Sequence, residues 1–142
     1  MENWILYGLV AAVCFGLNSV IYKIAYQKGN FSAYYGCFIF GLGVVLIFGI
    51  FFLSKPSFDF EWKSSSLALI AGVVWGLGFL AIAVAIGQKA SVAKLAPIYN
   101  ANTIITVIMG IILLKEIPDS SQILKIIAGA ALIVIGSVLV IV

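Results

Sequence analysis

Five long apolar segments, separated by short polar stretches, make up almost the whole of this 142-residue chain. Each segment is long enough to cross a hydrocarbon core of about 30 Å, which takes about 20 residues of helix. Apolar residues go nearly all the way round these segments instead of forming one stripe, which is typical of helices that face lipid. We therefore predict an all-α integral membrane protein with five transmembrane helices.

The composition excludes a water-soluble domain. Hydrophobic residues make up 64% of the chain and charged residues only 9%, against about 45–50% and about 25% in ordinary soluble domains. The first apolar segment is longer than the roughly 7–15 residues of a cleavable signal and has no basic residues before it. We expect this segment to be a retained helix.

The chain is expected to form a single transmembrane domain over residues 1–142. Four helices with one re-entrant segment are the alternative. The most hydrophilic stretch, Ser54 to Ser64, is expected to be an interfacial loop, because its aromatic residues suit the headgroup level. The five helices are predicted at about residues 4–26, 32–53, 65–87, 91–114 and 122–142.

The lysines give two possible topologies. Five crossings place Lys55, Lys63, Lys115 and Lys125 on the side of the N-terminus, and Lys23, Lys28, Lys89 and Lys94 toward the other side. This balance gives no orientation under the positive-inside rule, so the protein could insert both ways. If Lys23 and Lys94 lie within the membrane and are not counted, a weak preference for a cytoplasmic N-terminus remains.

Residue types that support catalysis or metal binding are scarce. The chain has no histidine, and Cys14 and Cys37 fall inside apolar segments, where they are expected to pack. No cofactor, no metal and no enzymatic activity are therefore expected. All acidic residues lie at ends or in predicted loops, so a carboxylate that exchanges protons inside the membrane is absent, and a facilitator or an exchanger fits better. These residues are Glu2, Asp59, Glu61, Glu116 and Asp119.

Polar side chains gather on one face of two predicted helices. At 100° per residue, one face of the fourth helix carries four of them, and one face of the first helix carries three more. Such residues are costly in hydrocarbon and often line a substrate pathway, although hydrogen bonds that only fasten the helices together are the alternative. The residues are Tyr99, Asn102, Thr103 and Thr106 on the fourth helix, and Tyr7, Asn18 and Tyr22 on the first.

Two further residues stand in the first turns of the fourth predicted helix. Lys94 either extends to the headgroups or presents a positive charge at a cavity mouth, where it would favour anionic substrates. Pro97 is expected to bend the helix, because it lacks the N–H that an interior position requires.

Several stretches resemble a known family. They are Ala71 to Gly78 (AGVVWGLG), Ala90 to Ala93 leading to Pro97, Leu113 to Glu116 (LLKE), and the closing helix with Gly129 and Gly136. Together they resemble one EamA repeat of the drug/metabolite transporter superfamily. The resemblance implies that the first, third and fourth helices line a cavity, which adds Trp75 to the candidates, and that Glu116 has a structural role. Members usually carry two such repeats, inverted around a central cavity.

The resemblance and the polar faces together predict a transporter. We expect a multi-pass protein of a prokaryotic inner (plasma) membrane that moves a small polar metabolite by alternating access. The expected partners are a small-molecule substrate, the lipid bilayer, and either a second copy in an antiparallel homodimer or a second half-transporter; nucleic acid is not expected. A non-transporting membrane subunit and a component of a lipid-linked-sugar flippase are the alternatives. A sugar, an amino acid or a quaternary ammonium compound could each suit aromatic rings and amides.

Overall fold

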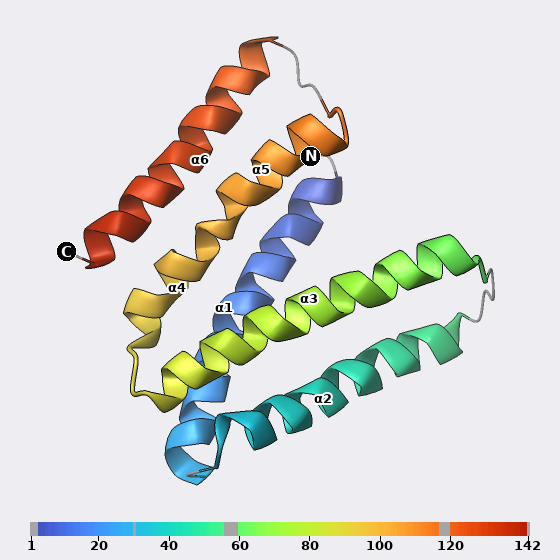
Figure 1. Cartoon of the computed structure of the whole chain (residues 1–142), viewed down its shortest axis with the longest axis vertical. Coiled ribbons are helices and arrows are strands. Elements are labelled where there is room, and N and C mark those ends of the chain that lie inside the picture. Colours follow the sequence, from blue (N-terminus) through green and yellow to red (C-terminus); the bar gives the residue numbers. More distant parts are fainter. Residues whose placement is uncertain (1–2, 30, 56–59, 117–119, 142) are drawn as a thin grey trace. The chain divides into compact units, whose positions relative to one another are not determined.

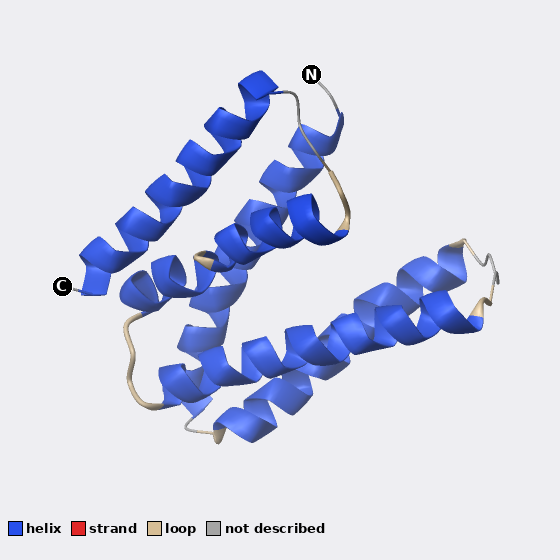
Figure 2. Ribbon diagram, turned by 45° about the horizontal axis from the view of Figure 1, so that its top comes forward, coloured by secondary structure: helices blue, strands red, loops and turns tan. Residues whose placement is uncertain are grey.

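Every regular element in the described part of the chain is an α-helix. The structure is a computed structural model that describes residues 3–29, 31–55, 60–116 and 120–141. Figure 1 and Figure 2 show the helices α1 (Asn3–Gly29), α2 (Ala33–Ser54), α3 (Trp62–Gly87), α4 (Val92–Asn100), α5 (Asn102–Leu113) and α6 (Ser120–Ile141).

Five spans long and apolar enough to cross a membrane are present among the described residues. The prediction of an all-helical protein with five transmembrane helices is therefore confirmed. α1, α2, α3 and α6 each provide one span, and α4 and α5 together provide the fourth, Val92–Leu113. The sequence suggested one bent helix here, and the structure instead has two helices, interrupted at Ala101.

Side-chain burial follows the pattern of a lipid-facing protein. Large apolar side chains are exposed along all five spans, for example Leu53 at 75% and Leu124 at 74%. Water does not tolerate so large an apolar surface, whereas lipid does. Among the residues that the structure describes, few side chains are buried: Ser19, Tyr22, Phe79, Ala83, Ile86, Ala130 and Ser137.

The chain divides into two compact units, Met1–Ala90 and Ser91–Val142. In the first unit, α2 packs against α3, and α1 contacts α3. In the second unit, α6 packs against both α4 and α5. Figure 1 shows α2 beside α3 within the first unit, and α6 beside α4 and α5 within the second.

Local capping explains where α2 and α3 begin. Ser32 precedes α2, and its hydroxyl oxygen accepts a hydrogen bond from the Tyr35 N–H at 3.2 Å. Glu61 precedes α3, and its carboxylate accepts from the Ser64 N–H at 2.9 Å. Each side chain satisfies one of the N–H groups that have no partner in the first turn of a helix. The Glu61 cap starts α3 at Trp62, three residues before the position expected from hydropathy.

The end of α3 is closed by a turn that contains a left-handed lysine. Lys89 has a φ of 68°, and its N–H donates to the Ile86 carbonyl at 3.0 Å while the Ala90 N–H donates to the Ala85 carbonyl at 3.1 Å. This pair of bonds defines a Schellman motif, in which glycine is the usual left-handed residue. The Lys23 ammonium of α1 donates to the Ala90 carbonyl at 3.0 Å, so it ties α1 to the end of α3.

Candidate functional site

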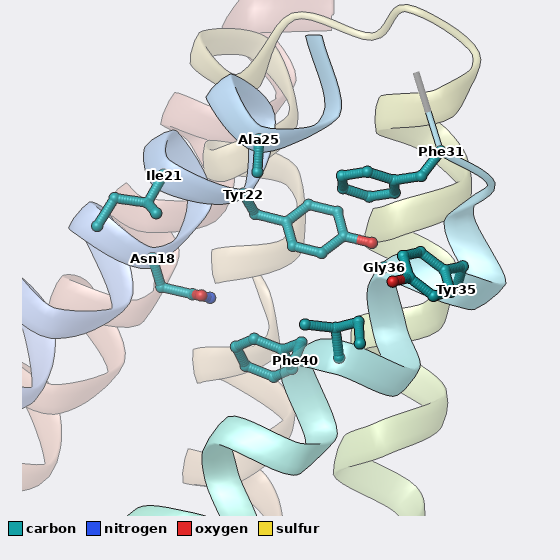
Figure 3. A pocket seen from close by; sticks show the side chains of 9 residues that line it. Asn18, Ile21, Tyr22, Ala25, Phe31, Tyr35, Gly36 and Phe40 are labelled. Carbon is teal, nitrogen blue, oxygen red and sulfur yellow. The ribbon is translucent and has the colours of Figure 1, made fainter. Parts of the chain in front are cut away.

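The first unit contains a cavity between the second half of α1 and the first turns of α2. Its volume is about 290 Å³ and it is partly open. Figure 3 shows side chains from both helices, and from the segment between them, around this space. The lining residues are Asn18, Ile21, Tyr22, Ala25, Phe31, Tyr35, Gly36, Ile39 and Phe40.

Tyr22 forms the inner wall of the cavity and is only 6% exposed. Its ring meets Phe79 of α3 edge to face at a centroid distance of 5.1 Å, and it also meets Phe31 at 6.3 Å. Its hydroxyl donates to the Ala33 carbonyl at 3.4 Å and lies 3.9 Å from the Cys37 sulfur. Edge-to-face packing of this kind holds a ring in one orientation, so Tyr22 provides a fixed wall.

Gly36 allows α2 to approach this wall. A Cβ atom at position 36 would collide with the Tyr22 hydroxyl oxygen and with the ring of Phe31. Glycine is the residue that lets the helix backbone come this close to two aromatic side chains. The shape of the cavity therefore depends on the absence of a side chain at this position.

Asn18 supplies the amide of the cavity. Its side chain extends from α1 toward α2 in Figure 3, and within the described residues it makes no hydrogen bond. A carboxamide offers two donors on its nitrogen and an acceptor oxygen. Asn18 can therefore bind a polar group of a small molecule in the cavity without giving up a bond within the protein.

A stack of aromatic rings continues from the cavity onto α3. Phe40 lines the cavity, and its ring stacks on Phe79 at 3.9 Å and on Trp75 at 5.6 Å. Trp75 is itself 46% exposed and does not line the cavity. Its ring lies one stacking layer from the cavity wall, where it supports Phe40.

The cavity lining carries no formal charge. The nine lining residues include amide and phenol groups but neither a lysine nor a carboxylate. Lys23, which follows Tyr22 in α1, directs its ammonium to the Ala90 carbonyl instead. An unpaired charge on a bound molecule would be costly to desolvate in such surroundings, so this lining suits a neutral polar molecule. Among the described residues, no group of three or more histidine, cysteine, aspartate or glutamate side chains could hold a metal ion.

The other predicted site residues belong to the second unit. The Thr103 hydroxyl donates to the Asn100 carbonyl at 2.9 Å, and the Thr106 hydroxyl donates to the Asn102 carbonyl at 3.2 Å. These hydroxyls bond within their own span, as threonine does in membrane helices. Tyr99 and Lys94 lie on α4, before the interruption, and the Lys94 side chain is exposed. Their role as cavity-lining residues, and that of Asn102, Thr103 and Thr106, stays a prediction.

Sequence reasoning selected Asn18 and Tyr22 but missed most of the opposite wall. Phe31, Tyr35 and Phe40 occur in a run of aromatic residues at the start of α2. In a span that faces lipid, such residues are read as lipid contacts because nothing in their type separates one side of the helix from the other. The density of aromatic residues from 31 to 40 was the available signal.

Comparison with known proteins identifies the family of the chain. Residues 2–142 match the EamA-like transporter family. The chain is also 28% identical, over 145 aligned residues, to a curated protein of Lactiplantibacillus plantarum named "Putative sugar uptake protein". That alignment covers 94% of this chain and 46% of the relative, so the chain spans about half the length of the relative. No solved structure matches the chain. The family match extends over the five spans and the cavity, and the chain belongs to the EamA-like transporter family.

Proposed function

We propose that the chain is one five-helix unit of a transporter that moves a small, uncharged polar metabolite across a prokaryotic inner membrane by alternating access. The cavity between α1 and α2 would form part of the substrate site. The observation that carries this proposal is the combination of a free amide, Asn18, with fixed aromatic walls and no charged side chain. Apolar walls with a few polar groups are typical of small-molecule sites.

Sugars are the first substrates to test. A monosaccharide is neutral, carries hydroxyl groups for an amide and has an apolar ring face that can lie against an aromatic ring. The cavity volume of about 290 Å³ is near the lower end of the range for small-molecule sites, so a single sugar ring is a suitable first probe of this part of the site. The name of the Lactiplantibacillus plantarum relative also refers to sugar uptake.

The rest of the substrate pathway would come from a second unit. The chain covers 46% of its relative, which is the share expected if the relative contains two such units. Inverted pairs of units around a site at the bilayer midplane are a common transporter design. An antiparallel homodimer and a pair with a second half-transporter both satisfy this requirement. Two reporter proteins, each active on a different side of the membrane, can be fused to the C-terminus to distinguish these two arrangements. Activity on one side alone would exclude the antiparallel homodimer.

Uptake into proteoliposomes tests the substrate site. We expect uptake of a labelled monosaccharide by the wild type, and a loss of roughly 5- to 150-fold in Asn18→Leu, because a hydrogen-bonding group of the bound sugar that is left without its partner costs about 1–3 kcal/mol. Leu17→Ala is the matched control, since Leu17 is the neighbouring residue of α1 and is 56% exposed. Uptake of charged amino acids in preference to sugars, or full sugar uptake by folded Asn18→Leu, would contradict the proposal.

A further inference from the structure

The interruption of the fourth span changes the hydrogen bonds of one main-chain carbonyl. In a continuous helix, the Pro97 carbonyl would accept from the N–H of Ala101, four residues later. Here the Ala101 N–H donates instead to the Ile98 carbonyl at 3.2 Å. A carbonyl without a donor is costly at membrane depth, so the Pro97 carbonyl needs another partner.

Ser137 of α6 provides this partner. Its hydroxyl donates to the Pro97 carbonyl at 2.6 Å, and the side chain is only 5% exposed. α6 packs against α4 on one side of the interruption and against α5 on the other. Ser137 therefore lies on the helix, α6, that contacts both halves of the interrupted span, α4 and α5.

The same hydroxyl has a second acceptor within reach. The carbonyl of Ile133, one turn earlier in α6, lies 2.8 Å from the Ser137 hydroxyl oxygen. A hydroxyl has one proton, so Ser137 can donate one hydrogen bond, either to the Pro97 carbonyl or to the Ile133 carbonyl. If the Ala101 N–H returned to the Pro97 carbonyl, Ser137 would still be satisfied within α6. Both the interrupted and the continuous arrangement therefore leave the Pro97 carbonyl and the Ser137 hydroxyl paired.

We infer that Ser137 is a positioning residue that keeps the fourth span interrupted and thereby sets the direction of α5. α5 carries Asn102, Thr103 and Thr106, so the hydroxyl of α6 determines where this polar segment points. Without the hydroxyl, only the continuous arrangement pairs the Pro97 carbonyl. This inference rests on the hydrogen bonds of Ser91–Val142 and is independent of the proposed substrate.

Distances between spin labels test the inference in lipid nanodiscs. Cys14 and Cys37 are first replaced by alanine, and labels are placed at Ile112→Cys in α5 and Leu124→Cys in α6, which are 65% and 74% exposed. From the interruption to residue 112, α5 extends about 15 Å. A change in direction of about 20–30°, the size of a sharp helix kink, would therefore move the label by about 5–8 Å. We expect a shift of this size in Ser137→Ala, and the wild-type distance in Ser137→Thr, which keeps the hydroxyl.

A second label pair separates positioning from simple fastening. Ala93→Cys in α4 and Leu139→Cys in α6 report whether α4 leaves α6, and we expect this distance to stay constant in Ser137→Ala. A shift of the 93–139 pair without one of the 112–124 pair would mean that Ser137 only fastens α4 to α6. An unchanged 112–124 distance in Ser137→Ala would also overturn the inference.

Ala101→Pro gives an independent test, because it removes the other possible donor to the Pro97 carbonyl, the Ala101 N–H. Proline has no N–H to return to the Pro97 carbonyl, and its ring fits the φ of −61° at Ala101. We expect this variant to keep the wild-type 112–124 distance even when combined with Ser137→Ala. A shift in the double variant equal to that of Ser137→Ala alone would show that the movement does not come from the return of the Ala101 N–H to the Pro97 carbonyl, and the inference would fail.

Discussion

Gly36→Ala is the substitution that most directly tests the construction of the cavity. The new methyl group would collide with the Tyr22 hydroxyl oxygen and with the Phe31 ring. Neither side chain can easily move away, because each is packed against other residues. Tyr22 is 6% exposed and is held edge to face by Phe79 at 5.1 Å, and the ring of Phe31 meets Tyr26 at 5.6 Å.

Two opposing effects determine how much Gly36→Ala changes the free energy of unfolding. Alanine is favoured over glycine in a helix by about 0.8–1 kcal/mol. Overpacking of a filled site costs about 1–3 kcal/mol, and two simultaneous collisions with fixed rings place this case in the upper half of that range. The free energy of unfolding should therefore fall by about 1–2 kcal/mol, which raises the unfolded-to-folded ratio about 5- to 30-fold.

Unfolding of the purified protein in detergent, followed by heat or denaturant, provides the assay. Gly43→Ala in the same helix is the matched control, because nothing lies within 4 Å of a Cβ atom at that position. It should be neutral or stabilising. Tyr22→Phe removes one of the two colliding atoms, so the double variant Gly36→Ala/Tyr22→Phe should lose less stability than the sum of its single variants. Equal stability of Gly36→Ala and Gly43→Ala would refute the reasoning.

Three further predictions concern the ends of the helices in the first unit. Lys89→Gly should raise the free energy of unfolding by about 1 kcal/mol, because glycine adopts the φ of 68° without the cost that a side chain carries; a melting temperature no higher than that of wild type would count against this. Lys23→Met should lower the free energy of unfolding by about 1 kcal/mol through loss of the bond to the Ala90 carbonyl, while Lys28→Met, at an exposed position in the same helix, should change it little. The hydrogen bonds that Glu61 accepts from the Ser64 hydroxyl and N–H lower the pKa of its carboxyl group from the ordinary 4.5. The contribution of this carboxylate to stability is therefore fully present above pH 4.5 and is lost as the pH falls through the lowered pKa. Protection of the amides at the start of α3 against hydrogen exchange, relative to their intrinsic rates at each pH, should decrease over this acid range in the wild type and not in Glu61→Gln.

The number and type of the elements could be read from the sequence because lipid imposes a simple requirement. A span must be apolar and about 20 residues long to cross the hydrocarbon core as a helix. This requirement is local, so each of the five spans carries its own signal. Two of the three polar residues selected in the first span, Asn18 and Tyr22, also line the cavity of the structure. Their contact with a substrate stays a prediction.

Helix arithmetic alone could not separate the two ends of α1. Tyr7 and Tyr22 fall on the same face at 100° per residue, yet Tyr7 is 72% exposed and Tyr22 is 6% exposed. The difference arises because Phe31 and Phe79, from outside α1, pack around Tyr22. No such partner surrounds Tyr7 within the described residues. Position on a face does not specify which part of that face meets another helix.

The interruption of the fourth span was likewise only partly predictable from the sequence. Pro97 predicted a disturbance, since a proline cannot supply its own N–H to the helix. The place of the interruption and the partner of the freed carbonyl were not predictable, because Ser137 lies 40 residues away in the sequence and donates to Pro97 across two packed helices.

The sequence by itself determined the class of protein, the five spans and the family resemblance, because these depend on composition and order along the chain. Only the tertiary structure decided which aromatic residues enclose the cavity, why a side chain at position 36 would collide with two of them, and which hydroxyl pairs with the Pro97 carbonyl at the interruption of the fourth span. In lipid, apolar side chains gain little from turning inward rather than outward. The choice between the two therefore depends on close packing and on hydrogen bonds between helices, which the pattern of residue types does not record.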